Sequence, residues 1–132
     1  MSLHTGQSNE IEFAVTEEMC ADYHGNNGVQ VMSTPYLIGS LEQAAAEVIQ
    51  PTLPEGSGSV GTAVTVRHLA ATPLGMKIRS RARVTEIDGK RITFQVEAED
   101  EVEIVMSGTH ERYIVGSIEK FMARVRGKAA GK

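Results

Sequence analysis

The sequence of 132 residues is poor in cysteine and aromatic residues, with one Cys, no Trp and 5% aromatic residues in all. A single cysteine, Cys20, excludes an internal disulfide and is typical of a reducing compartment, so we expect a cytoplasmic protein. No apolar run approaches the roughly 20 residues of a membrane span, and the N-terminus has no signal-peptide pattern. We therefore expect neither a membrane protein nor a disulfide-stapled scaffold.

Motifs of several catalytic and metal-binding classes are also absent. The four histidines, His4, His24, His68 and His110, lie too far apart in the sequence for the close spacing of a zinc motif. There is no G-x-S-x-G nucleophile elbow, no Walker loop and no dinucleotide fingerprint. Cys20 precedes a polar loop without an activating neighbour, so we interpret it as a structural thiol. No metal or organic cofactor is expected.

Charge is unevenly distributed along the chain. The formal net charge is −4, from 13 Lys and Arg against 17 Asp and Glu. All the acidic residues precede residue 120, whereas residues 120–132 carry five basic residues. A mostly acidic body argues against general nucleic-acid binding, which needs a basic surface to release counterions. The short basic tail either contacts an anion or is solvated, and we favour a solvated end.

The composition that remains, 41% hydrophobic and 23% charged, is ordinary for one soluble domain. Ser33-Thr34-Pro35 predicts the start of a helix that runs to about Gln50, with Thr34 as the N-cap and Pro35 at the first helical position. One broad apolar arc holds Leu37, Ile38, Leu41, Ala44, Ala45, Val48 and Ile49, with Ser40, Gln43 and Glu47 on the other side. So much apolar surface favours packing into the concave face of a sheet.

Most of the remaining chain is predicted to be extended. Strands are expected over residues 11–15, 60–68, 76–87, 90–101 and 104–115, followed by a helix capped by Ser117. We assign residues 1–10 to a flexible N-terminus, residues 11–116 to one domain and residues 117–132 to a C-terminal helix and basic tail. One long helix followed by antiparallel strands predicts an α+β fold.

The hairpin around Asp88-Gly89 has a predicted register. A three-residue loop with a left-handed Gly89 keeps the basic and apolar faces apart, and it places Arg79 opposite Glu97. We interpret the basic row on this hairpin as a solvated ion-pair ladder rather than a phosphate site.

Three polar residues near the predicted helix are candidates for chemistry. Glu42 borders the apolar arc, where a carboxylate suits a general base, or it is an edge carboxylate turned to solvent. His68 ends a strand on its apolar face and is either a proton-transfer group or a satisfied rim histidine. Thr34 either takes part in the chemistry or serves only as the helix cap. The N–H groups and positive dipole end of the helix start are suited to polarising a carbonyl.

Five segments of the sequence form a specific combination. They are Val31-Met32-Ser33-Thr34-Pro35-Tyr36-Leu37-Ile38, Leu41-Glu42 with the Ala-rich run 44–46, Ser59-Val60-Gly61-Thr62, Val66-Arg67-His68-Leu69-Ala70-Ala71-Thr72-Pro73, and Gly108-Thr109-His110-Glu111-Arg112. Together they resemble the hot-dog acyl-CoA thioesterases, and within them the fluoroacetyl-CoA thioesterase-like branch. The resemblance covers residue 11 to about residue 116.

This resemblance implies a hot-dog fold, in which an antiparallel sheet wraps a long central helix and two subunits form the active sites at their interface. It implies that Thr34, Glu42 and His68 are catalytic. It also implies that Gly61 allows close approach of the acyl thioester and that Arg112 supports the site. The implied function is metal-free hydrolysis of a small acyl-CoA by a homodimer or a tetramer of dimers.

One segment departs from that branch, and two other functions stay open. In the branch, bulky apolar residues before the helix help to cover the acyl group, whereas residues 23–27 here are Tyr-His-Gly-Asn-Asn. A hot-dog hydratase would add water to an enoyl-CoA, but its usual Asp/His catalytic loop is not evident. A binding module would capture an acyl-CoA or a small acid through Glu42 and His68 without hydrolysing it.

Overall fold

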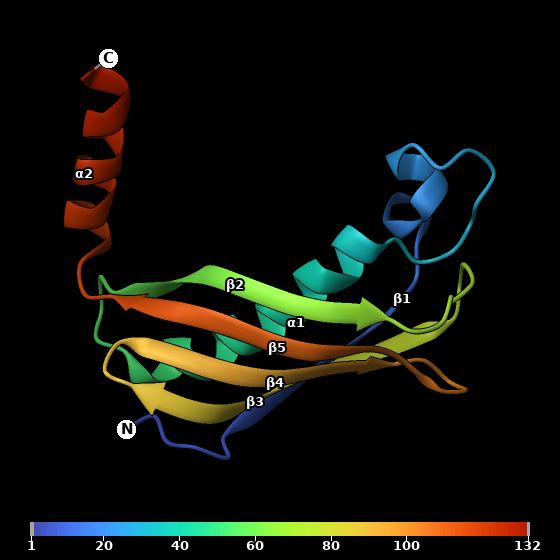
Figure 1. Cartoon of the computed structure of the whole chain (residues 1–132), viewed down its shortest axis with the longest axis horizontal. Helices are drawn as coiled ribbons and strands as arrows, with labels where there is room; N and C mark the ends of the chain where they lie inside the picture. The colour runs from blue at the N-terminus through green and yellow to red at the C-terminus, as the bar shows by residue number, and fades with distance from the viewer. Residues whose placement is uncertain (1, 132) are drawn as a thin grey trace.

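The computed structural model describes residues 2–131, in which five strands form one antiparallel sheet around a long helix (Figure 1). The elements in chain order are β1 (Ser8–Ala14), η1 (Glu17–Met19), η2 (Ala21–His24), α1 (Thr34–Ile49), η3 (Gln50–Thr52), β2 (Gly58–His68), β3 (Lys77–Asp88), β4 (Arg91–Glu99), β5 (Ile104–Val115) and α2 (Ile118–Ala130). The strand order in the sheet is β1-β3-β4-β5-β2. The predicted α+β class is confirmed. No helix within residues 2–131 is long and apolar enough to cross a bilayer.

Strand β1 begins earlier than the sequence pattern predicts. Residues 8–10, assigned to the flexible N-terminus, pair with residues 81–83 of β3. The side-chain amide of Asn9 also donates to the carbonyl of Ala44 at 3.2 Å and to Glu47 Oε1 at 3.0 Å. The start of β1 is therefore held by both the sheet and α1, through contacts that local composition does not reveal.

Helix α1 packs its apolar arc against the sheet and forms much of the core. Its buried residues are Leu37, Ser40, Leu41, Ala44, Ala45, Val48 and Ile49. Two details differ from the prediction. The N-cap is Ser33 rather than Thr34, since Ser33 Oγ accepts a hydrogen bond from the Tyr36 N–H at 3.3 Å. Ser40, expected on the polar side, is buried because its hydroxyl lies 2.7 Å from Ser80 Oγ on β3.

The β3–β4 hairpin keeps the predicted faces but not the predicted register. Gly89 is left-handed as expected, with φ of 63°. Arg79 nevertheless faces Glu99 rather than Glu97, because a two-residue turn is combined with a register shift within β3. Arg79 and Arg81 form ion pairs with carboxylates of both β1 and β4. The predicted solvated ladder is therefore confirmed.

Strand β2 forms one edge of the sheet and carries a row of exposed residues, 61–65. A long exposed edge strand presents unpaired N–H and C=O groups to another chain. Helix α2 projects away from the sheet beyond this edge (Figure 1), and none of its described residues is buried. Ser117 caps α2 as predicted, since its Oγ accepts from the Lys120 N–H at 3.2 Å.

Candidate active site

Thr34 and His68 meet at the N-terminal end of α1. Thr34 is the first residue of α1, and His68 is the last residue of β2. Thr34 Oγ1 lies 2.7 Å from His68 Nδ1, which is a hydrogen-bond distance. Because Ser33 caps the helix, the Thr34 hydroxyl is available for this contact. The structure therefore joins two of the three predicted catalytic residues.

The surroundings of His68 favour a neutral ring. Partial burial lowers the pKa of His68, and a backbone contact with Ala70 offsets only part of that effect. A neutral ring accepts the Thr34 proton at Nδ1 when its other hydrogen is on Nε2. Nε2 is buried and has no hydrogen-bond partner among residues 2–131.

A cavity of about 380 Å³ opens beside the Thr34–His68 pair. Its other lining residues are Val31, Met32, Leu69, Ala70 and Ala71. Apolar walls with a few convergent polar groups are typical of small-molecule sites. The cavity is therefore suited to a small apolar group held against the Thr34 hydroxyl.

Glu42 lies farther along α1 and faces β2 at Gly61. A Cβ atom placed on Gly61 would stand 2.7 Å from Glu42 Oε2, so glycine leaves the room that this carboxylate occupies. The same Cβ would lie 3.3 Å from His110 Cε1 and 3.5 Å from Arg112 Nη1. Glu42, Gly61 and His110 also line a cavity of about 350 Å³. Three predicted site residues, Glu42, Gly61 and Arg112, are thus brought together here.

His110 belongs to this cluster, although the sequence pattern suggested it only as an unlikely metal ligand. Its side chain is 2% exposed, and Nδ1 lies 2.8 Å from the carbonyl oxygen of Ala63. Nδ1 therefore carries a hydrogen, which leaves Nε2 to accept from Arg112 Nη1 at 3.3 Å. Burial is the main cause that lowers the pKa of His110. The sequence contained one usable signal for His110. It is two residues from Arg112, and residues at this spacing on a strand point to the same face of the sheet.

Arg112 is a buried cation, with 8% of the residue exposed. Its Nε donates to Ser59 Oγ at 2.9 Å, and its Nη2 donates to the Ser59 carbonyl at 3.0 Å. Burial lowers the pKa of Arg112, and the charge of Glu42 offsets part of that shift. Within residues 2–131, no carboxylate forms a direct ion pair with Arg112. Glu42 is therefore its nearest source of compensating charge, acting across a short gap.

The two groups of site residues lie apart within one chain. Thr34 and Glu42 are eight residues apart on α1. The helical rise therefore separates their backbones by about 12 Å along the axis. Glu42 of the same chain is therefore remote from the Thr34–His68 pair along the helix. Within one protomer, the predicted catalytic residues therefore lie in two places. Thr34 and His68 are together at the start of α1, and Glu42 is beside Gly61.

The start of α1 offers fewer free N–H groups than the sequence predicts. Pro35 has none, and the Tyr36 N–H is bound by Ser33 Oγ. The Leu37 N–H donates to the Ser33 carbonyl at 3.1 Å. The edge of β2 is a second source of N–H groups, because alternate groups on an edge strand point away from the sheet.

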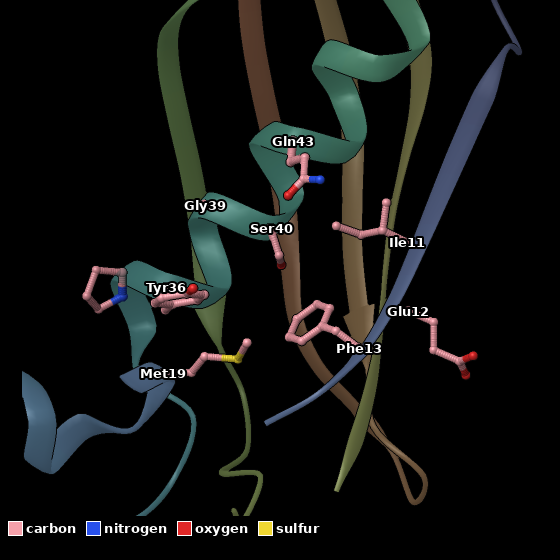
Figure 2. Close-up of a pocket in the computed structure, with 9 residues that line it drawn as sticks. Ile11, Glu12, Phe13, Met19, Tyr36, Gly39, Ser40 and Gln43 are labelled. Carbon is pink, nitrogen blue, oxygen red and sulfur yellow. The ribbon is translucent and has the colours of Figure 1, made fainter. Parts of the chain in front are cut away.

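Another cavity, of about 450 Å³, lies between α1 and β1 (Figure 2). The side chains of Phe13, Met19 and Tyr36 line it (Figure 2). None of the predicted site residues lines this cavity, and the amide of its Gln43 donates to Glu47 at 3.0 Å. It is a largely apolar hollow that lies outside the candidate active site.

Cys20 does not provide a second reactive centre. The residue is 1% exposed, and its Sγ donates to the Thr16 carbonyl at 3.4 Å. Burial raises the pKa of Cys20, and the charges of Asp22 and Glu17 add to the effect. The thiol is therefore protonated and unreactive at neutral pH, as a structural thiol should be. Within residues 2–131, no three His, Cys, Asp or Glu side chains gather in a group that could hold a metal ion.

Solved structures define the class to which this fold and site belong. The structure matches that of the fluoroacetyl-CoA thioesterase FlK with a TM-score of 0.88 and 33% identity, covering 97% of this chain and 98% of that chain. A hot-dog-like protein from Thermanaerovibrio acidaminovorans matches with a TM-score of 0.86 and 27% identity, covering 94% of this chain and 91% of that chain. The protein is a hot-dog thioesterase by fold, which confirms the resemblance drawn from its motifs.

The particular family follows from the sequence matches. The profile of FlK, the fluoroacetyl-CoA-specific thioesterases, matches residues 15–117. The fluoroacetyl-CoA thioesterase of Streptantibioticus cattleyicolor is 40% identical over 99 residues, which cover 75% of this chain and 70% of that protein. The chain belongs to the FlK family of thioester hydrolases. Variants of FlK have been solved in complex with acetyl-CoA and with fluoroacetate and CoA.

Proposed function

We propose that this protein hydrolyses a small acyl-CoA thioester to the free acid and CoA, at a site completed by two copies of the chain. Family membership and the acyl-CoA and CoA complexes of FlK variants support this function. The observation that carries it is the contact of 2.7 Å between Thr34 Oγ1 and His68 Nδ1 beside an apolar cavity. In this proposal Thr34, His68 and Glu42 are the catalytic residues, and Gly61 and Arg112 support the site.

Pairing of two chains through their exposed β2 edges would bring the Thr34–His68 pair of one chain close to Glu42 of the other. In an antiparallel pairing of two β2 strands about an axis between Val64 and Thr65, His68 stands opposite the partner's Gly61. Glu42 lies directly over Gly61 within its own chain. The partner's Glu42 therefore comes close to the His68 ring and stabilises its charged form across the interface. The proposed functional unit is a homodimer with two such sites.

The resulting arrangement moves a proton away from the attacking oxygen. His68 accepts a proton at Nδ1, while the negative charge of the partner's Glu42 stabilises the charged ring. In one route the Thr34 oxygen adds to the thioester carbonyl, the C–S bond breaks, CoA leaves with the proton from His68, and water then cleaves the acyl-threonine ester. In the other route Thr34 positions a water molecule that adds directly. An N–H group of β2 that this pairing leaves free stabilises the oxyanion in both routes.

The acyl group in this proposal is small and is not restricted to fluoroacetyl. The cavity beside Thr34 holds about 380 Å³ and has apolar walls. Residues 25–28, Gly-Asn-Asn-Gly, are exposed and contribute no bulky apolar side chain near the start of α1. The chain therefore lacks, in this segment, an apolar cover that would favour one small acyl group over another.

Spectroscopic detection of CoA thiol over a panel of acyl-CoAs tests the function. The wild-type protein should release thiol, and Glu42→Gln should lower kcat by about 10²–10⁴-fold through loss of the charge that stabilises the protonated His68 ring. Glu47→Gln, the same change on the solvent side of α1, is the matched control and should leave kcat unchanged. Full turnover by both Glu42→Ala and His68→Ala overturns the assignment. Tight acyl-CoA binding without thiol release supports the binding-module alternative instead.

A further inference from the structure

A fourth cavity lies where β5 meets α2, on the face of the sheet opposite to α1. Val60 and Tyr113 pair across β2 and β5 and line this cavity. Their neighbours Gly61 and Arg112 face Glu42, and successive side chains of a strand point to opposite faces. The cavity has a volume of about 440 Å³. This size lies within the roughly 300–1,000 Å³ typical of small-molecule sites.

Three cations line this cavity, which we call the α2 pocket. Lys90 comes from the turn between β3 and β4, and Lys120 and Arg124 come from α2. Within the described chain, none of the three forms an ion pair with a carboxylate, and no acidic residue lines the pocket. The whole chain carries a formal charge of −4. Three unpaired cations around one hollow therefore create a local positive potential that attracts an anion.

Two aromatic rings complete the α2 pocket, those of Tyr113 and Phe121. The guanidinium carbon of Arg124 lies 5.6 Å from the centroid of the Phe121 ring, a cation–π contact that holds the cation at the pocket. Tyr113 is 47% exposed, so its ring is accessible to a ligand. Aromatic rings beside cations suit a nucleotide, because a base stacks on the rings while its phosphates bind the cations.

We propose that the α2 pocket binds the nucleotide end of the acyl-CoA substrate, with its phosphates on the cations and its adenine on the aromatic rings. This inference rests on the proposed thioesterase function. The α2 pocket and the cavity beside Glu42 both include Thr62, so the two hollows adjoin at the edge of β2. In the proposed pairing, the segment that joins the two β2 strands ends at Gly61. The flexible arm of CoA passes from one face of the sheet to the other beyond that end.

Calorimetric titration with adenosine 3′,5′-bisphosphate tests the pocket without any turnover. The double variant K120Q/R124Q removes two cations that line the α2 pocket. R126Q/K128Q is the matched control, since it removes two cations of the same helix that do not line it. The first variant should bind the bisphosphate at least about tenfold more weakly than the wild type, because charge-assisted hydrogen bonds are lost. The control should bind it as the wild type does.

Steady-state kinetics supplies a second readout. K120Q/R124Q should raise the KM for an acyl-CoA by about tenfold. The KM for the corresponding acyl-N-acetylcysteamine thioester, which lacks the nucleotide, should stay unchanged. Equal effects of the two double variants, or an equal rise in KM for both substrates, overturn the pocket as a nucleotide site. If the wild type hydrolyses no thioester, the proposed function fails, and the bisphosphate titration still decides the pocket.

Discussion

Thr34 Oγ1 lies 2.7 Å from one ring nitrogen of His68, and the other ring nitrogen is buried with no hydrogen-bond partner in the described chain. One protomer therefore holds a hydroxyl and an imidazole in contact. Glu42, the third predicted catalytic residue, is about 12 Å farther along α1. In our proposal, a second copy of the chain brings its own Glu42 to the His68 ring.

Thr34→Ala distinguishes the proposed catalytic role of the Thr34 hydroxyl from a role in capping α1. We expect kcat to fall by about 10²-fold or more, since the hydroxyl that attacks or positions water is lost. The free energy of unfolding should change by less than about 0.5 kcal/mol, because Ser33 caps α1. Thiol release and urea denaturation measure the two effects.

Ser33→Ala is the matched control for that variant. It should lower the free energy of unfolding by about 1 kcal/mol through loss of the cap and should retain most of the turnover. If Ser33→Ala abolishes turnover as fully as Thr34→Ala does, the catalytic role of Thr34 is wrong.

Gly61→Ala should displace the carboxylate of Glu42. The added methyl group would stand 2.7 Å from Glu42 Oε2, and this oxygen is the end of a flexible side chain, so the carboxylate moves rather than the strand. We expect kcat to fall by about 10²-fold, as for a misplaced catalytic group. The free energy of unfolding should fall by less than about 1 kcal/mol.

The control for this substitution is Gly39→Ala on α1, where an added Cβ meets no atom within 4 Å. It should stabilise the helix by about 0.5–1 kcal/mol and leave kcat unchanged. Wild-type turnover in Gly61→Ala would show that the position of Glu42 over Gly61 is not needed.

Activity and stability should both decline on acidification. Burial lowers the pKa of His68 and of His110. Only the neutral ring of His68 accepts a proton, so kcat/KM should fall as the pH falls through the pKa of His68. The unfolded chain binds more protons than the folded one in this range. The contribution of these two histidines to the free energy of unfolding is therefore complete above about pH 6.5, and it is lost as the pH falls through their lowered pKa values.

Rate profiles and urea denaturation between pH 4.5 and 8 measure these two effects. A kcat/KM that stays constant or rises on acidification would contradict His68 as the proton acceptor. A free energy of unfolding that rises on acidification would contradict the depressed pKa values of the two histidines.

The fold was largely predictable because burial follows simple periods. The apolar arc of α1 and the alternation along β3 to β5 predict a helix against a sheet. Tertiary contacts decided the details that the patterns missed. Ser40 is buried because Ser80 lies opposite it, and β1 starts early because Asn9 bonds to α1. The predicted cap, Thr34, was wrong because its hydroxyl contacts His68 and the preceding Ser33 caps α1 instead.

The candidate site was predictable in its residue types but not in its division. The motifs predict Thr34, Glu42 and His68 as one catalytic set, because a motif does not show which of these residues come from the same subunit. The structure separates Glu42 from the other two along one helix and leaves β2 unpaired at its edge. His110 was missed because its spacing from Arg112 indicates a shared strand face but not a shared site, and the contact between the two side chains exists only in the folded chain.

The most direct test of a site shared between two copies is subunit complementation. Glu42→Gln and His68→Gln chains with different affinity tags are co-expressed, and the mixed dimer is purified through both tags. Each parent dimer should be inactive. The mixed dimer should have one intact site, from Thr34 and His68 of one chain and the partner's Glu42, and should show about half of the wild-type turnover. A mixed dimer as inactive as its parents would contradict the shared site.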